Sequence, residues 1–234
     1  MPEPQDFLSP TCYVDSDAPP ARNLARGFLA KVVDDRPHSK AVALFEGVRD
    51  AIRYDPYSIS LTPQEYRAST VANRSAAFCV PKAILLAAVA RASGIPAGGG
   101  FADVRNHLNS PRLRAVIDTD LFIYHGYVSL WPDGRWVKVT PAFNMELCQR
   151  FGIRPLIFDG RNDALFPEYD AQDRRHMEYV NDRGFFVEPP IEQTLRDFTA
   201  TYPNMTRLLR EQGSIAADDA TFLAPSFKQR LLES

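Results

Sequence analysis

The chain has 234 residues, of which 45% are hydrophobic and 24% are charged, a composition typical of soluble globular proteins. Its 27 basic and 29 acidic residues give a formal net charge of −2, so charge gives no reason to expect nucleic acid or an anionic membrane as a partner. No apolar run approaches the roughly 18 residues that a membrane-spanning helix needs. The length predicts one domain with elaborations, and nothing in the sequence favours a particular oligomeric state.

The cysteines indicate a reducing compartment. Cys12, Cys79 and Cys148 are odd in number and widely spaced, which is not the pattern of a disulfide framework. The first residues also lack the basic and apolar segments of a signal peptide, so we expect a cytoplasmic protein. The histidines and cysteines lack the spacing of zinc ligands, and glycines 98–100 are not a phosphate-binding motif. We therefore expect no metal and no cofactor.

Helical patterns dominate the first third of the chain. Residues 1–20 contain five prolines and predict an extended arm. Residues 21–33 and 39–54 have apolar side chains at helical spacing, with Ser39 as the expected N-cap of the second helix. Residues 62–75 begin like a helix and then become polar. We expect residues 1–40 to pack as an arm and a helix on a core formed by residues 41–144.

The stretch 76–97 predicts a central, mostly buried helix. Gly94 and Pro96 end it, and Pro81 suits its first turn, so Cys79 falls at the helix start. Free amides and the positive end of the helix dipole favour a thiolate there. The plainer interpretation of Cys79 is a small packing residue on a buried helical face.

Strands follow the central helix. Residues 98–104 suggest a strand entered through a tight glycine bend, and residues 105–120 look irregular. Residues 121–131 and 135–143 flank the turn Pro132-Asp133-Gly134 and predict a hairpin. Strict alternation puts Phe122 and Tyr124 on one face of the first strand and His125 on the other.

The remaining residues, 145–234, form a predicted C-terminal extension of the same domain. Short helices are expected at 145–151, 192–202 and 205–211, with a weakly amphipathic tail at 221–234. The loops between 159 and 179 are candidates for a lid over the site.

Two segments together resemble the transglutaminase-like (papain-related) superfamily: FCVPKAILLAAVARASGIPA and YHGYVSLWPDGRWVKVTPAFN. In that family a nucleophilic cysteine opens the core helix, and a histidine base lies in the first strand of a hairpin. The resemblance covers residues 41–144. It implies an α+β papain-like core in which a central helix bearing Cys79 packs on an antiparallel sheet bearing His125. Without the resemblance, His125 would read as a half-exposed strand histidine.

The sequence departs from the family at the third catalytic position. The family usually has an aspartate before the proline of the second strand, where this chain has Thr140. A threonine hydroxyl can accept a hydrogen bond from the imidazole but brings no charge. We expect Thr140 to orient His125. The alternatives are that Asn144 or Asp103 takes this role, that the site is catalytically compromised, or that Thr140 is a plain strand residue.

The resemblance implies a thiol enzyme acting on a peptide, protein or small-molecule acyl substrate. Cys79 would form an acyl-enzyme with His125 as base, and water (protease or amidase) or an amine (acyl transfer) would resolve it. Two other functions stay open: an amide-forming or cyclising enzyme of small-molecule biosynthesis, and an inactive binding module with the same fold. Further candidates for substrate contact are Asp103, Asn106, His107, Trp131 and Asn144.

Overall fold

The apolar stretch before Gly94 forms a helix at the centre of the molecule. The structure, a computed structural model, describes residues 3–107, 110–166 and 177–215. The helices are η1 (Pro4–Phe7), α1 (Pro19–Leu29), α2 (Pro37–Ala51), η2 (Pro63–Tyr66), α3 (Ala68–Val71), α4 (Cys79–Ala92), α5 (Pro111–Ile117), α6 (Met145–Phe151), α7 (Ile191–Thr201) and α8 (Pro203–Gln212). The strands are β1 (Arg53–Tyr54), β2 (Ala76–Ala77), β3 (Ala97–Asn106), β4 (Leu121–Leu130), β5 (Val137–Val139) and β6 (Met177–Phe186).

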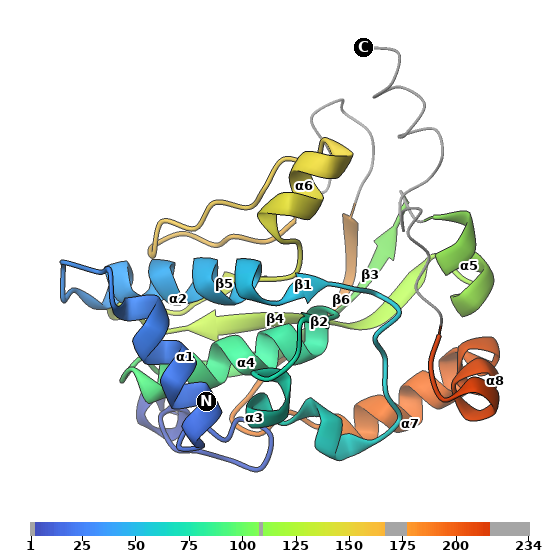
Figure 1. The fold of residues 1–234 in the computed structure, drawn as a ribbon, viewed down its shortest axis with the longest axis horizontal. Helices are drawn as coiled ribbons and strands as arrows, with labels where there is room; N and C mark the ends of the chain where they lie inside the picture. The colour runs from blue at the N-terminus through green and yellow to red at the C-terminus, as the bar shows by residue number, and fades with distance from the viewer. Residues whose placement is uncertain (1–2, 108–109, 167–176, 216–234) are drawn as a thin grey trace.

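Helix α4 is the predicted central helix. Every residue from Cys79 to Arg91 is buried, because the sheet covers one side of the helix and α1, α2 and α3 cover the other (Figure 1). Gly94, in the left-handed region at φ +77°, follows the helix end as its sequence position predicts. This confirms the predicted central helix and its packing on the sheet.

Two charged side chains of α4 are buried, and both bind backbone carbonyl groups. The Lys82 ammonium donates to the carbonyls of Arg49 and Ile52 at the end of α2, and burial lowers the pKa of Lys82 to about 7. The Arg91 guanidinium donates to the carbonyls of Ser9, Ala97 and Val187. These contacts join α4 to α2, to the N-terminal arm and to the end of the sheet where β3 begins and β6 ends.

The main sheet has the strand order β5-β4-β3-β6, and all of its neighbours are antiparallel. The hairpin β4–β5 confirms the predicted turn at 132–134. The expected bend at glycines 98–100 is wrong, because these residues lie inside β3. A Cβ on Gly100 would come within 2.2 Å of the Tyr127 ring, so this glycine leaves space for an aromatic side chain over the sheet.

A β-bulge interrupts β4 just before His125. Ala102 pairs with His125 and Val104 pairs with Phe122, so Ile123 and Tyr124 together oppose the single residue Asp103. Because Ala102 and Val104 are two residues apart, their partners His125 and Phe122 share one face of the sheet. The prediction that Phe122 and His125 lie on opposite faces is therefore wrong, since strict alternation assumed no extra residue.

Other boundaries differ locally from the prediction. Helix α2 has Arg36 as its N-cap and Pro37 at its first position, rather than Ser39 as the cap. Residues 111–117, expected to be irregular, form α5, whose first turn is capped by Ser110 accepting a hydrogen bond from the Leu113 amide.

Mixed helices packed on an antiparallel sheet confirm the predicted α+β class. The C-terminal segment contributes β6 to the same sheet, and α7 and α8 pack beside it. The predicted tail at 221–234 and most of the candidate lid lie outside the described residues. In the part of the chain that the structure describes, no helix is long and apolar enough to cross a membrane. The division at residues 40 and 144 stays a prediction.

Candidate functional site

Cys79 is the first residue of α4, and it is nearly buried, with 9% of its surface exposed. Burial raises the pKa of the Cys79 thiol to about 11. Hydrogen bonds from the backbone amides of Gly126, Val80 and Cys79 itself act in the opposite direction, because they favour the thiolate. Burial has the larger effect, so the resting group is a thiol rather than the thiolate that the helix position alone favours.

Gly126 brings β4 against the start of α4. A Cβ on Gly126 would lie 2.8 Å from the Cys79 carbonyl oxygen and 2.8 Å from the Cα of Val80, both backbone atoms. Only glycine permits this approach without displacing the strand or the helix. Since His125 precedes Gly126, the close approach places His125 beside the residue that carries the thiol.

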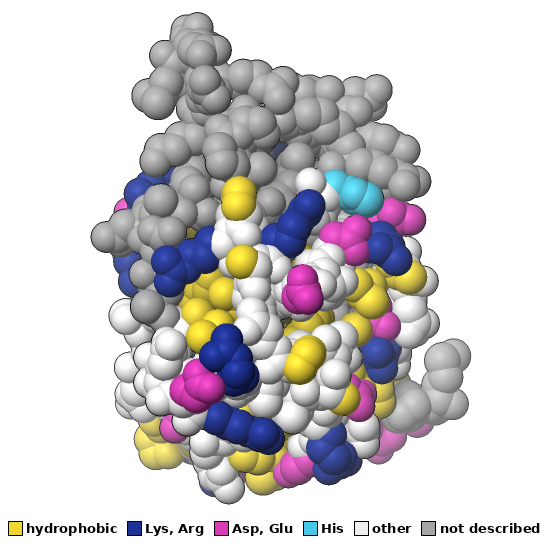
Figure 2. Space-filling model, turned by 90° about the vertical axis from the view of Figure 1, so that its right-hand side faces the viewer, with side chains coloured by type: hydrophobic (Ala, Val, Ile, Leu, Met, Phe, Trp, Pro, Cys, Tyr) yellow, Lys and Arg dark blue, Asp and Glu magenta, His cyan; other side chains and the backbone are white. Residues whose placement is uncertain are grey.

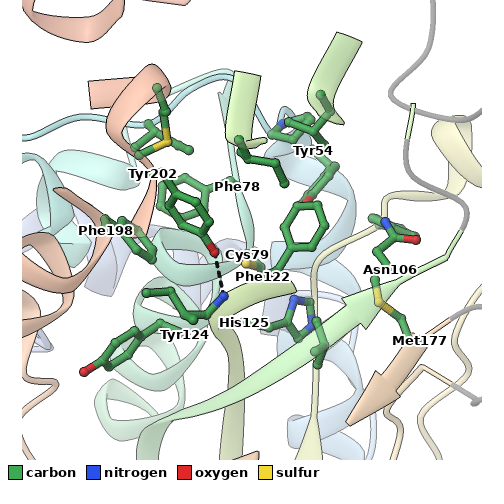
Figure 3. Close-up of a pocket in the computed structure, with 18 residues that line it drawn as sticks. Tyr54, Phe78, Cys79, Asn106, Phe122, Tyr124, His125, Met177, Phe198 and Tyr202 are labelled. Atoms are coloured by element: carbon green, nitrogen blue, oxygen red, sulfur yellow. Dashed lines mark hydrogen bonds between the residues drawn. The ribbon is translucent and has the colours of Figure 1, made fainter. Parts of the chain in front are cut away.

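Cys79 and His125 both border one cavity (Figure 3). The cavity measures about 60 Å³ of space open to the centres of water molecules. Its walls come from β1, the loop after it, α4, β3, β4, β6 and the helices α5, α7 and α8. The described lining residues are Tyr54, Pro56, Ile59, Phe78, Cys79, Val104, Asn106, Leu113, Ile117, Phe122, Ile123, Tyr124, His125, Phe143, Met177, Phe198, Tyr202 and Met205.

The bulge places His125 on the cavity wall. The imidazole is 5% exposed, and the Phe166 ring packs near it with centroids 6.0 Å apart. Phe166 in turn packs against Phe143 at 4.5 Å. The chain after β5 thus contributes aromatic support beside the histidine.

The backbone amides of the two bulge residues, Ile123 and Tyr124, both donate hydrogen bonds to side chains. The Ile123 amide donates to the Tyr202 hydroxyl at 2.7 Å, and the Tyr124 amide donates to Asp103 Oδ1 at 3.1 Å. Figure 3 shows the Tyr202 contact, which fastens the junction of α7 and α8 to β4. Asp103 therefore supports the strand next to His125 and is not among the described residues that line the cavity.

Tyr124 itself is in the left-handed region, with φ +55°, which is unusual for a bulky residue. Three groups hold it there. Asp103 accepts from its amide, the Arg183 guanidinium lies 4.1 Å from its ring centroid, and its hydroxyl donates to Asp197 at 2.6 Å. Arg183 also pairs with Asp103 at 2.7 Å. Backbone strain of this kind is often found where a structure fixes a neighbouring functional group.

Thr140 and Asn144 are buried, and each forms a hydrogen bond with a backbone group near the site. The Thr140 hydroxyl donates to the Gly126 carbonyl at 3.1 Å, so it supports the peptide that follows Gly126, one residue beyond His125. The Asn144 side-chain oxygen accepts from the Tyr54 amide at 3.0 Å, and Tyr54 lines the cavity. Their predicted roles as orienter and substitute orienter of the imidazole stay predictions.

The other predicted contact residues separate into two groups. Asn106 lines the cavity with Cys79 and His125. His107 and Trp131 are not among the described lining residues: His107 contacts Glu178 at 3.1 Å, and Trp131 packs on Trp136 at the far end of β4. The sequence reasoning did not identify Tyr124, Gly126 or Tyr202. Of these, Gly126 carried a usable signal, since a glycine inside a strand pattern suggests close backbone approach.

Within the described residues, no group of three or more His, Cys, Asp or Glu side chains is placed to hold a metal ion. Cys12, Cys79 and Cys148 are all free thiols. The described site offers a thiol, an imidazole and backbone amides as functional groups.

Comparison with known proteins gives a family similarity over half of the chain. Residues 22–141 match the family model described as the transglutaminase-like superfamily. The crystal structure of a Cytophaga hutchinsonii protein described as "a Putative Cysteine Protease" superposes with a TM-score of 0.40 at 20% identity. That match covers 76% of this chain and 51% of the other, so this chain spans about half of that protein's length. No curated protein matches the chain.

Proposed function

The chain belongs to the transglutaminase-like superfamily, and from that premise we propose that it is a thiol enzyme that forms an acyl-enzyme on Cys79. The acyl donor is an amide or related carbonyl compound, in a peptide, a protein or a small molecule. The single observation that carries this proposal is the contact of Gly126 with the start of α4, which sets His125 beside Cys79 at one cavity.

The first step is attack of the Cys79 sulfur on the substrate carbonyl carbon. Because burial keeps the thiol protonated, His125 removes the thiol proton as the carbon–sulfur bond forms, rather than holding it beforehand. The amides at the start of α4, including that of Cys79, are in position to stabilise the negative oxygen of the tetrahedral intermediate. His125 then gives the proton to the leaving group.

Thr140 is proposed to orient this base. The Thr140 hydroxyl donates its hydrogen bond to the Gly126 carbonyl, so its oxygen can still accept a hydrogen bond from the imidazole. A threonine gives direction without the charge of an aspartate, so the imidazolium gains less stabilisation than in relatives with the acid. The expected consequence is a slower base-assisted step.

Water or an amine resolves the acyl-enzyme. With water the protein is a protease or amidase, and with an amine it is an acyltransferase, which includes amide-forming and cyclising chemistry. The free state of the three cysteines fits a reducing compartment, and we propose a cytoplasmic location.

A second candidate is a binding module without catalysis. Two observations favour it: the raised pKa of Cys79 and the threonine at the family's aspartate position. In this case an acyl donor would bind in the cavity without forming a thioester.

The test is trapping of the acyl-enzyme by intact-protein mass spectrometry with an activated thioester. All proteins carry Cys12→Ser, which removes the exposed thiol. In this background we expect one acyl group with Cys79 present and also on Cys148→Ala, which removes another buried cysteine away from the cavity. We expect none on Cys79→Ala and much slower acylation of His125→Ala. Acylation of Cys79→Ala at the native rate would overturn the proposal, and added amines would show whether the acyl group passes to nitrogen or to water.

A further inference from the structure

The described walls of the cavity beside Cys79 are largely apolar. Among the described lining residues there is no Asp, Glu, Lys or Arg, and the walls are mainly aliphatic and aromatic. Asn106 is the one described lining residue with a side-chain amide. The outer surface differs: on the face that carries α5, α7 and α8, basic and acidic side chains are interspersed (Figure 2).

Three charged side chains around Tyr124 bind other protein groups. Asp103 binds Arg183, and Asp197 accepts from the Tyr124 hydroxyl. Neither carboxylate nor the guanidinium lies among the lining residues. A charged ligand group in the cavity would lose its hydration without gaining a carboxylate, ammonium or guanidinium partner from the described lining residues, which is unfavourable.

One wall of the cavity comes from α5 and the C-terminal helices α7 and α8. Met205 of α8 is fully buried and lines the cavity together with Phe198 of α7 and Leu113 of α5. Tyr202 holds this wall on β4 through its hydrogen bonds to Ile123 and Leu121. The cavity therefore has a defined end. Phe198, Tyr202 and Met205 of this end lie outside the family match over 22–141, and Leu113 lies inside it.

We propose, on the basis of the proposed function, that the acyl group carried by the substrate is uncharged and apolar and occupies this cavity. The carbonyl carbon lies next to the Cys79 sulfur, with the His125 imidazole beside it as base. The hydrocarbon part of the acyl group extends toward Met205. The 60 Å³ open to water centres is small, so a short hydrocarbon chain, on the order of six carbon atoms or fewer, fits it better than a long one.

The first experiment uses the full chain and a series of acyl thioesters of N-acetylcysteamine. The rate of Cys79 acylation is expected to rise about fourfold per added methylene group from acetyl to the best length, because each buried methylene adds a similar increment of transfer free energy. Beyond about six carbons the rate is expected to fall. Glutaryl, which carries a carboxylate at its end, is expected to react at least 100-fold more slowly than pentanoyl, which has the same number of carbons.

Variants of the cavity end test the position of the chain. Met205→Ala is expected to move the best length to a longer acyl group, and Met205→Phe to a shorter one. Arg207→Gln, on the exposed side of the same helix, is the matched control and should leave the preference unchanged. Equal rates for glutaryl and pentanoyl, or no dependence on chain length in the native protein, would overturn the proposal while leaving the acyl-enzyme reaction intact.

Binding to Cys79→Ala separates the cavity from the reaction. Unreactive alkanamides of two to eight carbons, measured by calorimetry, are expected to bind more tightly with length up to the same limit. If the native protein forms no thioester but Cys79→Ala shows this dependence, the apolar site stands and the enzymatic proposal fails. If neither acylation nor alkanamide binding is seen, both fail.

Discussion

The pH dependence of Cys79 alkylation tests the balance between burial and hydrogen bonding at the helix start. With a pKa of about 11 instead of 9.0, the thiolate fraction at pH 7 falls about 100-fold, to about 10⁻⁴. A more basic thiolate is also a better nucleophile, and a Brønsted coefficient near 0.45 recovers about eightfold of this loss. The expected rate with iodoacetamide at pH 7 is therefore about tenfold below that of an ordinary thiol, before any limit from access.

The assay is intact-mass labelling of a variant in which Cys12→Ser and Cys148→Ser leave Cys79 as the one cysteine. The rate is expected to rise about tenfold per pH unit between pH 7 and 10, because the thiol loses its proton only near pH 11. N-acetylcysteine is the reference thiol, and urea-unfolded protein is the reference for access. His125→Ala is expected to show the same profile. A rate plateau below pH 8 that disappears in His125→Ala would refute this reasoning, since it would mean that His125 holds the thiol proton in the resting protein.

Three further substitutions test the framework of the site. Lys82→Met tests the buried ammonium. The unfolded chain keeps the Lys82 proton up to about pH 10.5 and the folded chain only to about pH 7, so unfolding takes up a proton between these values, and the free energy of unfolding of the native protein should rise by roughly 1.4 kcal/mol per pH unit relative to the variant. Urea denaturation at pH 7, 8 and 9 measures this difference, and a constant difference would contradict the expectation. Gly126→Ala should lower the free energy of unfolding by about 1–3 kcal/mol and slow acylation of Cys79, because its Cβ meets backbone atoms; native stability would argue against the close approach. Asp103→Ala should lower kcat/KM at least tenfold, because the bulge at Tyr124 loses its hydrogen-bond acceptor. Asp103→Asn keeps an acceptor oxygen, so its kcat/KM should be closer to that of the native protein. Equal losses in both variants would indicate that the charge of Asp103, paired with Arg183, matters instead.

Much of the site could be predicted from sequence because its signals were local. Pro81 and Gly94 delimit α4, so the start of the helix at Cys79 follows from turn and cap chemistry. The hairpin is marked in the same way by residues 132–134. The family resemblance then rests on the order and spacing of several features in the segments that carry Cys79 and His125.

The bulge could not be predicted, because it depends on partners distant in the sequence. Nothing in the residues around Tyr124 marks a left-handed conformation, and the groups that hold it come from β3, β6 and α7. Strand β6 was missed for a related reason. It is an edge strand with two register shifts against β3, and its middle residues are exposed, so it shows no regular alternation. Helix α5, in contrast, carried a readable signal in Ser110-Pro111 that was overlooked.

Tyr202 connects the C-terminal helices α7 and α8 to β4, the strand that bears His125. Its hydroxyl serves both the Ile123 amide and the Leu121 carbonyl. A chimera that kept residues 22–141 and replaced α7 and α8 with helices from another protein would remove the hydrogen-bond partner of this amide and carbonyl. Each buried polar group left without a hydrogen bond lowers the free energy of unfolding by about 1–3 kcal/mol. Exchanging these helices to alter specificity therefore requires that a tyrosine at this position be transplanted with them.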